Sequence, residues 1–332
     1  MMQTNNKTFY GIQDNVERYT LITWTLIVLA SSIVGDSVIL LATIKYNAIK
    51  LNKVIVVVIQ HLAVCDLILA LFVLLPTTVD LIADHCVMGE VFANIEVHIP
   101  HACYPAQRLL ICAMTVLKLM LLKYPLRSAS WSSRYGHNIS CVMWTVVLCV
   151  YAPLVMGFLF YIRNTLHFDY VSYSCHYDLT SPDAPTWVKN YHLIFINLAI
   201  IIPCTVLLVT SILILMSAKK AVSRCGGTLR LEGVLTVLLT VGLLFVSFLP
   251  YCVMFVAWHL GHSQNNTWYR ATHFLSFLNL TANFFVCSLA VKSFRNFLKL
   301  KMSQLFFKQS FERSSSTSKS TLARTTIQRQ FS

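Results

Sequence analysis

Residues 54–82 have the sequence VIVVVIQHLAVCDLILALFVLLPTTVDLI, which is a continuous apolar run long enough to cross a lipid bilayer. A bilayer core about 30 Å thick takes roughly 20 residues of helix. In lipid, only helices and closed barrels satisfy every backbone hydrogen bond. A barrel would show short segments of alternating apolar and polar residues, and this run does not alternate. We therefore predict a transmembrane helix here.

Six further runs of this kind lie on either side. The predicted spans are 20–45, 54–82, 91–122, 138–161, 189–217, 231–260 and 268–291. The composition agrees, because 56% of the residues are hydrophobic and 12% are charged, whereas a soluble domain carries about 25% charged residues. We predict an all-α membrane protein, a seven-transmembrane helix bundle. Residues 1–18 are polar, so no signal peptide is expected, and the first run is expected to remain as an anchor.

The positive charge is distributed as membrane topology would place it. The net charge of +13 lies in short segments between the apolar runs, which argues against a nucleic-acid partner. Twenty of the 26 Lys and Arg residues fall on one side of the predicted topology and five on the other. The positive-inside rule then predicts an extracellular N-terminus and a cytoplasmic C-terminus. The sequons at Asn6 and Asn265 fall on the predicted outside, and we expect glycosylation there.

Short motifs recur in these runs in a fixed order. They are Gly35-Asp36, Leu62-Ala63-Val64-Cys65-Asp66, Thr115-Val116-Leu117-Lys118-Leu119, Lys123-Tyr124-Pro125-Leu126-Arg127, Trp144, Pro153, Pro203, Phe245-Val246-Ser247-Phe248-Leu249-Pro250, Asn279, Asn283-Phe284-Phe285-Val286-Cys287 and Lys292-Ser293-Phe294-Arg295-Asn296-Phe297. The ordered set covers about residues 20–302 and resembles the rhodopsin-like (class A) G-protein-coupled receptors.

The resemblance implies an architecture and an activity. It implies an extracellular N-terminus (1–19), a seven-helix domain with a short amphipathic eighth helix (20–302) and a cytoplasmic Ser/Thr-rich tail (303–332). It also implies a plasma-membrane receptor that binds an extracellular ligand and signals through a heterotrimeric G protein, with arrestin docking on the tail and lipid around the helices. A transporter would show internal repeats, and we find none. We find no catalytic motif and expect no enzyme activity.

Several positions depart from the family's pattern where its members switch between inactive and active packing. They are Leu117, Lys118, Leu119, Phe248, Phe284 and Cys287. These departures imply weak or constitutive coupling. The alternative is a non-coupling seven-helix protein, such as a scavenger or a modulator of another receptor.

Polar residues within the apolar runs predict a buried cluster. Its predicted members are Asp36, Asp66, Gln107, Arg108, Asn279 and Asn283. Intramembrane carboxylates usually pair or line a polar cavity. The resemblance implies a sodium ion at Asp66, and the alternative is that both carboxyls are protonated and hydrogen-bonded. Arg108 stays charged, so it either pairs with Asp66 or Asp36 or faces water.

The outer half of the bundle is the expected ligand side. The expected lining residues are His98, His101, Tyr104, His192, Phe248, Trp258, His273 and Phe277. Nine of the 11 histidines map to this half, where they either sense protons or zinc or form an ordinary polar lining. The resemblance argues against an amine ligand, because Pro100 stands where amine receptors carry an Asp. It argues against retinal, because Phe277 stands where opsins carry a Lys.

The resemblance also assigns the inner end and a disulfide. Lys118 stands where the family carries a coupling arginine, and Arg230, with Glu232 the nearby carboxylate, stands near an expected acidic position. Two cations would repel there, although solvent screens the effect. The family ties the top of the third helix to the second outer loop, where Cys175 lies. Cys86 is the expected partner because Ala93 occupies the usual position, and Cys103 is a deeper rival.

Overall fold

The computed structural model describes residues 13–49, 51–83, 85, 87, 89–124, 128, 130–161, 166–169, 174–177, 201–225, 231–259 and 266–304. The described helices overlap the predicted apolar runs, and residues 189–200 of the fifth run lie outside the described residues. They are α1 (Gln13–Leu40) with the π-helical turn η1 (Leu41–Lys45), α2 (Lys53–Leu69) with η2 (Ala70–Leu74) and α3 (Leu75–Ala83), α4 (Gly89–Lys123), α6 (Ser133–Tyr161), α8 (Ile202–Cys225), α9 (Leu231–His259), α10 (Asn266–Ser276) and α11 (Asn279–Ala290). Residues 292–304 form a further helix.

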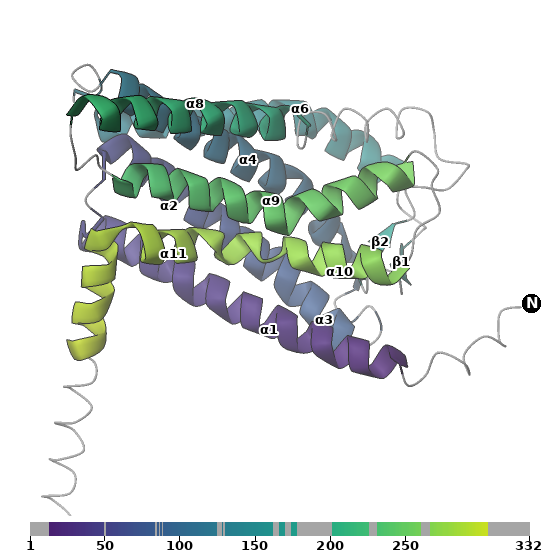
Figure 1. Cartoon of the computed structure of the whole chain (residues 1–332). Helices are drawn as coiled ribbons and strands as arrows, with labels where there is room; N and C mark the ends of the chain where they lie inside the picture. The colour runs from purple at the N-terminus through teal and green to yellow at the C-terminus, as the bar shows by residue number, and fades with distance from the viewer. Residues whose placement is uncertain are drawn as a thin grey trace, which may run out of the picture.

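The long helices run side by side, and the helix of residues 292–304 turns away across one end of the bundle (Figure 1). We call this end the tail end. The opposite end holds the start of α1 and two short strands, and we call it the hairpin end (Figure 1). Helix α4 lies at the centre of the packing, where it contacts α2, α6 and α8. Residues on α4 can therefore touch several helices at once.

A small β-hairpin is a departure from the predicted all-helical fold. Strand β1 (Leu166–Asp169) pairs antiparallel with β2 (Ser174–Tyr177), and His167 faces His176 across the pair. Strand β2 packs on α3 and α4. The hairpin lies between α6 and α8 in the sequence, and pairing gives its backbone groups the hydrogen bonds that a helix would otherwise supply.

Several helices are suited to a membrane by length and composition. Within the described residues, Val16–Lys45, Lys53–Ala83 and Ala102–Lys123 are each long and apolar enough to cross a bilayer. The pair Thr267–Ser276 and Asn279–Ala290, bent by 46°, makes a fourth if it counts as one span. In α8 and α9 the apolar helical stretches are shorter.

The burial pattern is that of a protein dissolved in lipid. Large apolar side chains such as Val34, Val146 and Val246 are exposed on the outside of the helices, while Asp36 and Asp66 are fully buried. A water-soluble bundle would show the reverse pattern. In a bilayer, polar side chains are most stable between helices, where they have partners.

Local contacts fix how the helices begin and how closely they approach. Helix α2 begins after its N-cap residue, Asn52, whose side-chain oxygen accepts a hydrogen bond from the Val54 N–H at 3.0 Å.

Helices α1 and α11 touch at Gly35. A Cβ atom added to Gly35 would lie 2.7 Å from Cβ and Cγ of Phe284. The packing of α1 on α11 therefore depends on the absence of a side chain at position 35.

Candidate functional site

A hydrogen-bonded polar cluster joins α2, α4 and α11 in the middle of the bundle. The Asp66 carboxylate, on α2, accepts a hydrogen bond on Oδ1 from the Gln107 amide and one on Oδ2 from the Asn283 amide at 2.5 Å. The Asn279 amide in turn donates to Oε1 of Gln107 at 2.7 Å. Four of the six residues predicted from the sequence for the ion cluster are thus connected directly.

Asp36, on α1, lies beside this cluster and is only partly satisfied. The Ser32 hydroxyl donates to its Oδ2 at 3.0 Å. Its Oδ1 has no hydrogen-bond partner in the part of the chain that the structure describes, and Asp36 is 0% exposed. Asp66 is near enough for the two carboxylates to repel when both are charged. One oxygen of Asp36 is thus free to accept a further hydrogen bond or to contact a cation.

The residues present can be compared with what a sodium ion needs. Hard cations bind oxygen, but both Asp66 oxygens here face amide N–H groups. In this arrangement the cluster does not fit a sodium ion at Asp66. The amides of Gln107 and Asn283 would have to turn over to present oxygen. The orphaned Oδ1 of Asp36 is the one oxygen of the two carboxylates without a hydrogen-bond donor among the described residues.

Arg108 does not pair with either carboxylate, which departs from one of the two arrangements expected from the sequence. Its guanidinium carbon lies 3.4 Å from the centroid of the Phe248 ring and 5.2 Å from that of Tyr104. Atoms Nε and Nη2 have no hydrogen-bond partner among the described residues. Both oxygens of Asp66 already accept hydrogen bonds from neutral amides, and the free oxygen of Asp36 does not contact Arg108. The Arg108 side chain is also 1% exposed, so it does not reach the outer surface of the bundle.

A run of aromatic rings extends from Arg108 toward the hairpin end. We call it the ring cluster, and its members are Tyr104, Phe248, Tyr251, Tyr269, His273 and Phe277. The centroids of Phe248 and Tyr251 are 6.0 Å apart, and Tyr251 stacks on His273 at 5.3 Å. These spacings are those of favourable ring pairs. Tyr251 and Tyr269 were not expected from the sequence, since a tyrosine in an apolar run has no distinguishing signal.

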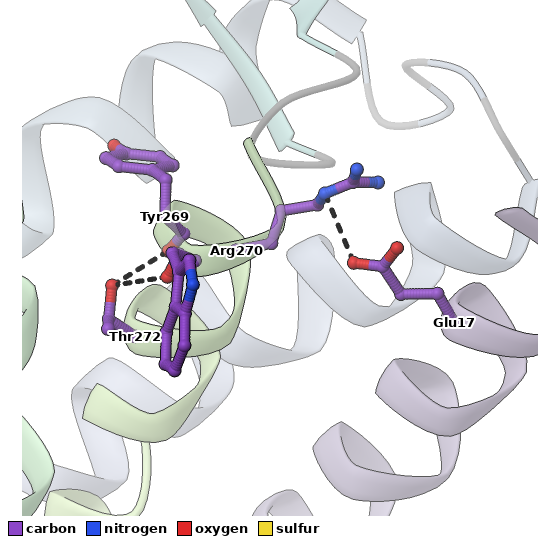
Figure 2. Close-up of polar contacts among 5 residues, drawn as sticks. Glu17, Tyr269, Arg270 and Thr272 are labelled. Atoms are coloured by element: carbon purple, nitrogen blue, oxygen red, sulfur yellow. Dashed lines mark hydrogen bonds and ion pairs between the residues drawn. The ribbon is translucent and has the colours of Figure 1, made fainter. Parts of the chain in front are cut away.

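Polar contacts hold α1 against α10 and α3 at the hairpin end. Figure 2 shows Arg270 of α10 reaching Glu17 of α1, with Nε of Arg270 3.3 Å from Oε1 of Glu17. The Trp24 indole N–H donates to the carbonyl of Phe274 at 2.9 Å, and Arg18 donates to the carbonyls of Leu81 and Ile82. Sequence reasoning did not predict these contacts, because charged residues near a membrane surface are common.

At the tail end, Lys118 lies inside the bundle. The side chain is 6% exposed, and its Nζ has no hydrogen-bond partner within the described residues. The neighbouring Leu117 and Leu119 are also buried. Nearby, the hydroxyls of Thr210 and Thr115 are 3.2 Å apart and connect α8 to α4. Arg230 and the side chain of Glu232 lie outside the described residues, so the expected repulsion of Lys118 stays a prediction.

Other expected site residues also lie outside the described part. They are the side chains of His98, His101, Trp258 and Cys175 and the whole of Asn6, Cys86, His192 and Asn265. The rival cysteine, Cys103, is buried and free, and its carbonyl accepts a hydrogen bond from the Cys65 thiol.

The sequence of the chain was compared with known protein families. Residues 35–286 match the family described as 7 transmembrane receptor (rhodopsin family). This match covers most of the chain. The chain belongs to this family. It is therefore a class A G-protein-coupled receptor and a multi-pass membrane protein. No curated protein is similar enough to the receptor to be counted as a relative.

The match includes the residues of the polar cluster. Asp66, Gln107, Asn279 and Asn283 all fall within residues 35–286, and the hydrogen bonds that join them connect three helices of the receptor. Lys118 falls in the same range, with buried leucines on either side. The matched region of the receptor thus contains both the interhelical polar cluster and the buried Lys118.

Proposed function

We propose that the receptor binds an extracellular ligand from the hairpin end and couples at the tail end to a heterotrimeric G protein. In this proposal the chain crosses the plasma membrane seven times, with its N-terminus outside and its C-terminus in the cytoplasm. Residues 292–302 then form an amphipathic eighth helix at the inner membrane surface. The tail from 303 on is the arrestin-docking segment.

The polar cluster is the observation that carries the proposal. The buried network joins α2, α4 and α11 through Asp66, Gln107 and Asn283. A movement of one of these helices breaks hydrogen bonds to the others, and each broken bond leaves a buried polar group unsatisfied. Such a network supports switching between discrete packings. A protein that served only as an anchor would have no need of it.

The ligand side is proposed from the position of the rings. Tyr104, Phe248, His273 and Phe277 lie together between α4, α9, α10 and α11. We propose that they line the ligand site together with His98, His101, His192 and Trp258. Mixed aromatic and imidazole groups suit a ligand with an apolar body and a polar group.

Coupling is proposed to be weak, with a raised basal level. A lysine lacks the planar fork of donors that arginine presents, so contact with the G protein is reduced. Leu117 removes the aspartate that would hold that position in the resting state. Both states therefore lose a contact. The basal level rises where the resting state loses more than the active state, and the weaker contact with the G protein lowers the maximal response.

A sodium ion at Asp66 is proposed as a modulator of the resting state. Support comes from the orphaned Oδ1 of Asp36 and the negative charge of two neighbouring carboxyls. The ion would be held by Asp66 with Asp36 beside it, and the amides of Gln107 and Asn283, which donate to Asp66 in this arrangement, would turn over to present oxygen.

The experiment is a cell assay of G-protein activation at graded surface expression, with and without a broad ligand panel. The proposal expects basal activation that rises with the amount of receptor at the surface and falls in Lys118→Ala. The control is Tyr19→Phe, which changes an exposed side chain at the hairpin end and leaves the basal signal unchanged. Ligand uptake without any G-protein activation would instead support the alternative, a non-coupling scavenger or modulator of another receptor. The residues Leu117 and Lys118 are the sequence changes that favour this alternative.

A further inference from the structure

Arg108 is a buried cation in the centre of the receptor. It is 1% exposed, and rings cover its guanidinium at 3.4 Å (Phe248) and 5.2 Å (Tyr104). Arginine keeps its charge in proteins. A buried charge is costly unless it has both a counter-charge and hydrogen-bond partners. The two rings supply part of the attraction through their faces, but they leave the N–H groups at the guanidinium edge unsatisfied.

The helices around Arg108 offer no counter-charge. The chain has 13 acidic residues, and none of them lies in 97–168, 184–231 or 233–311. These ranges cover α4 from residue 97 to its end, all of α6, α8, α10 and α11, and all of α9 except its second residue. On α1 and α2, Asp36 and Asp66 accept hydrogen bonds from Ser32, Gln107 and Asn283 instead. The missing anion therefore comes from outside these helices.

The geometry of the unsatisfied donors indicates which anion fits. The two orphaned atoms, Nε and Nη2, lie on the same edge of the guanidinium, so their N–H bonds are parallel. This fork matches the two oxygens of a carboxylate. A phosphate dianion would need further donors that the surrounding rings do not supply. A chloride ion would use the fork less completely because it is a single atom.

The surroundings indicate the rest of the ligand. From Arg108 the ring cluster runs through Phe248, Tyr251 and His273 toward the hairpin end. Apolar and aromatic bodies pack well against such rings. We propose that Arg108 binds the carboxylate of an organic acid whose apolar body lies along the ring cluster. This inference rests on the proposed receptor function, because it names the chemical class of the ligand.

The test measures binding without any signalling step. Full-length receptor is purified in detergent, and its melting temperature is measured against increasing hydrocinnamate and decanoate. The neutral probes are hydrocinnamyl alcohol and decanol, and sodium chloride is titrated separately. We expect the carboxylates to raise the melting temperature and the alcohols not to. We expect Arg108→Gln to weaken the apparent affinity for the carboxylates by about tenfold or more, with a smaller loss in Arg108→Lys.

Controls separate this result from a folding defect. Arg134→Gln removes an exposed arginine and should bind the carboxylates as the wild type does. Arg108→Gln should melt at a higher temperature than the wild type without ligand, since it removes an unpaired buried charge.

Four outcomes overturn the proposal. They are the absence of any carboxylate effect on the wild type, equal shifts from the alcohols, equal carboxylate binding by Arg108→Gln, and a chloride shift that depends on Arg108 and leaves no added carboxylate effect. Carboxylate binding without G-protein activation would leave this inference standing and remove the proposed coupling. Activation without carboxylate binding would do the reverse.

Discussion

At the scale of single residues, the two buried carboxyls differ in what they contact. Asp66 is bonded through both oxygens, whereas Asp36 has an orphaned oxygen. Replacing Asp36 with Asn removes the charge at nearly constant volume. We predict that Asp36→Asn raises the melting temperature in sodium-free buffer, because it removes a buried charge that has no counter-charge among the described residues.

Sodium provides the control for this substitution. If the proposed ion is held by Asp36 and Asp66 together, sodium should stabilise the wild type and stabilise Asp36→Asn much less. A lower melting temperature for Asp36→Asn in both buffers would show that the carboxyl at position 36 is satisfied, and would contradict the prediction.

The residues of the polar cluster were predictable because each one interrupts an apolar run. Asp66, Asn279 and Asn283 stand out for this reason, and lipid gives polar groups few places to go. The surroundings of Arg108 were not predictable to the same degree. The sequence shows that an Arg needs a partner, but it does not show that neutral amides already occupy both oxygens of Asp66. Serine and tyrosine carry no such signal, so Ser32 and Tyr251 were missed.

At the scale of helices, Gly35 sets the distance between α1 and α11. We predict that Gly35→Ala lowers the stability of the receptor by about 1–3 kcal/mol, because the added methyl group overlaps Phe284 and overpacking costs this much. Thermal melting in detergent measures the change. The double variant Gly35→Ala with Phe284→Ala should recover part of the loss.

The matched control is Gly242→Ala in α9, where an added Cβ meets nothing within 4 Å. Alanine favours a helix over glycine by roughly 1 kcal/mol, so this variant should be neutral or more stable. Equal loss from both substitutions would mean that helix propensity or the membrane surface, and not the α1–α11 contact, controls the effect.

Helix positions followed from hydropathy, but the details within helices did not. The π-helical turn η2 lies just before Pro76, whose missing N–H leaves the Phe72 carbonyl without its helical hydrogen bond, so a proline marks it. The turn η1 and the break between Ser276 and Asn279 fall in stretches with no Gly or Pro to mark them. They arise from tertiary packing, which overrides local preference. The hairpin β1–β2 was missed for a similar reason, since four-residue strands in a long polar connection have too little pattern to detect.

At the scale of the whole molecule, a bond between Cys86 and Cys175 would restrain the long connection between α6 and α8 over the hairpin end. We predict that Cys86→Ser reduces surface expression and melting temperature, because such a bond contributes roughly 2–4 kcal/mol. Cys175→Ser should have the same effect, and the double variant should be no worse than either alone. Normal expression and stability of both single variants would rule the bond out.

The family and the broad architecture were predictable from sequence because lipid imposes helix length, and ordered landmarks along the chain are hard to produce by chance. Coupling strength was not predictable. It depends on the small free-energy difference between the inactive and active packings of the same helices. A single polar residue such as Lys118 can change that difference by as much as the difference itself.

Basal G-protein activation of Lys118→Arg, compared with the wild type at matched surface expression, tests the central claim most directly. Arginine would restore the planar fork at a buried position where Nζ of Lys118 has no partner among the described residues. A gain of about 1 kcal/mol in contact with the G protein corresponds to roughly a fivefold shift in an equilibrium. We therefore predict that Lys118→Arg increases basal activation several-fold. Unchanged basal and stimulated activation in a well-expressed Lys118→Arg receptor would contradict the account and favour a non-coupling protein.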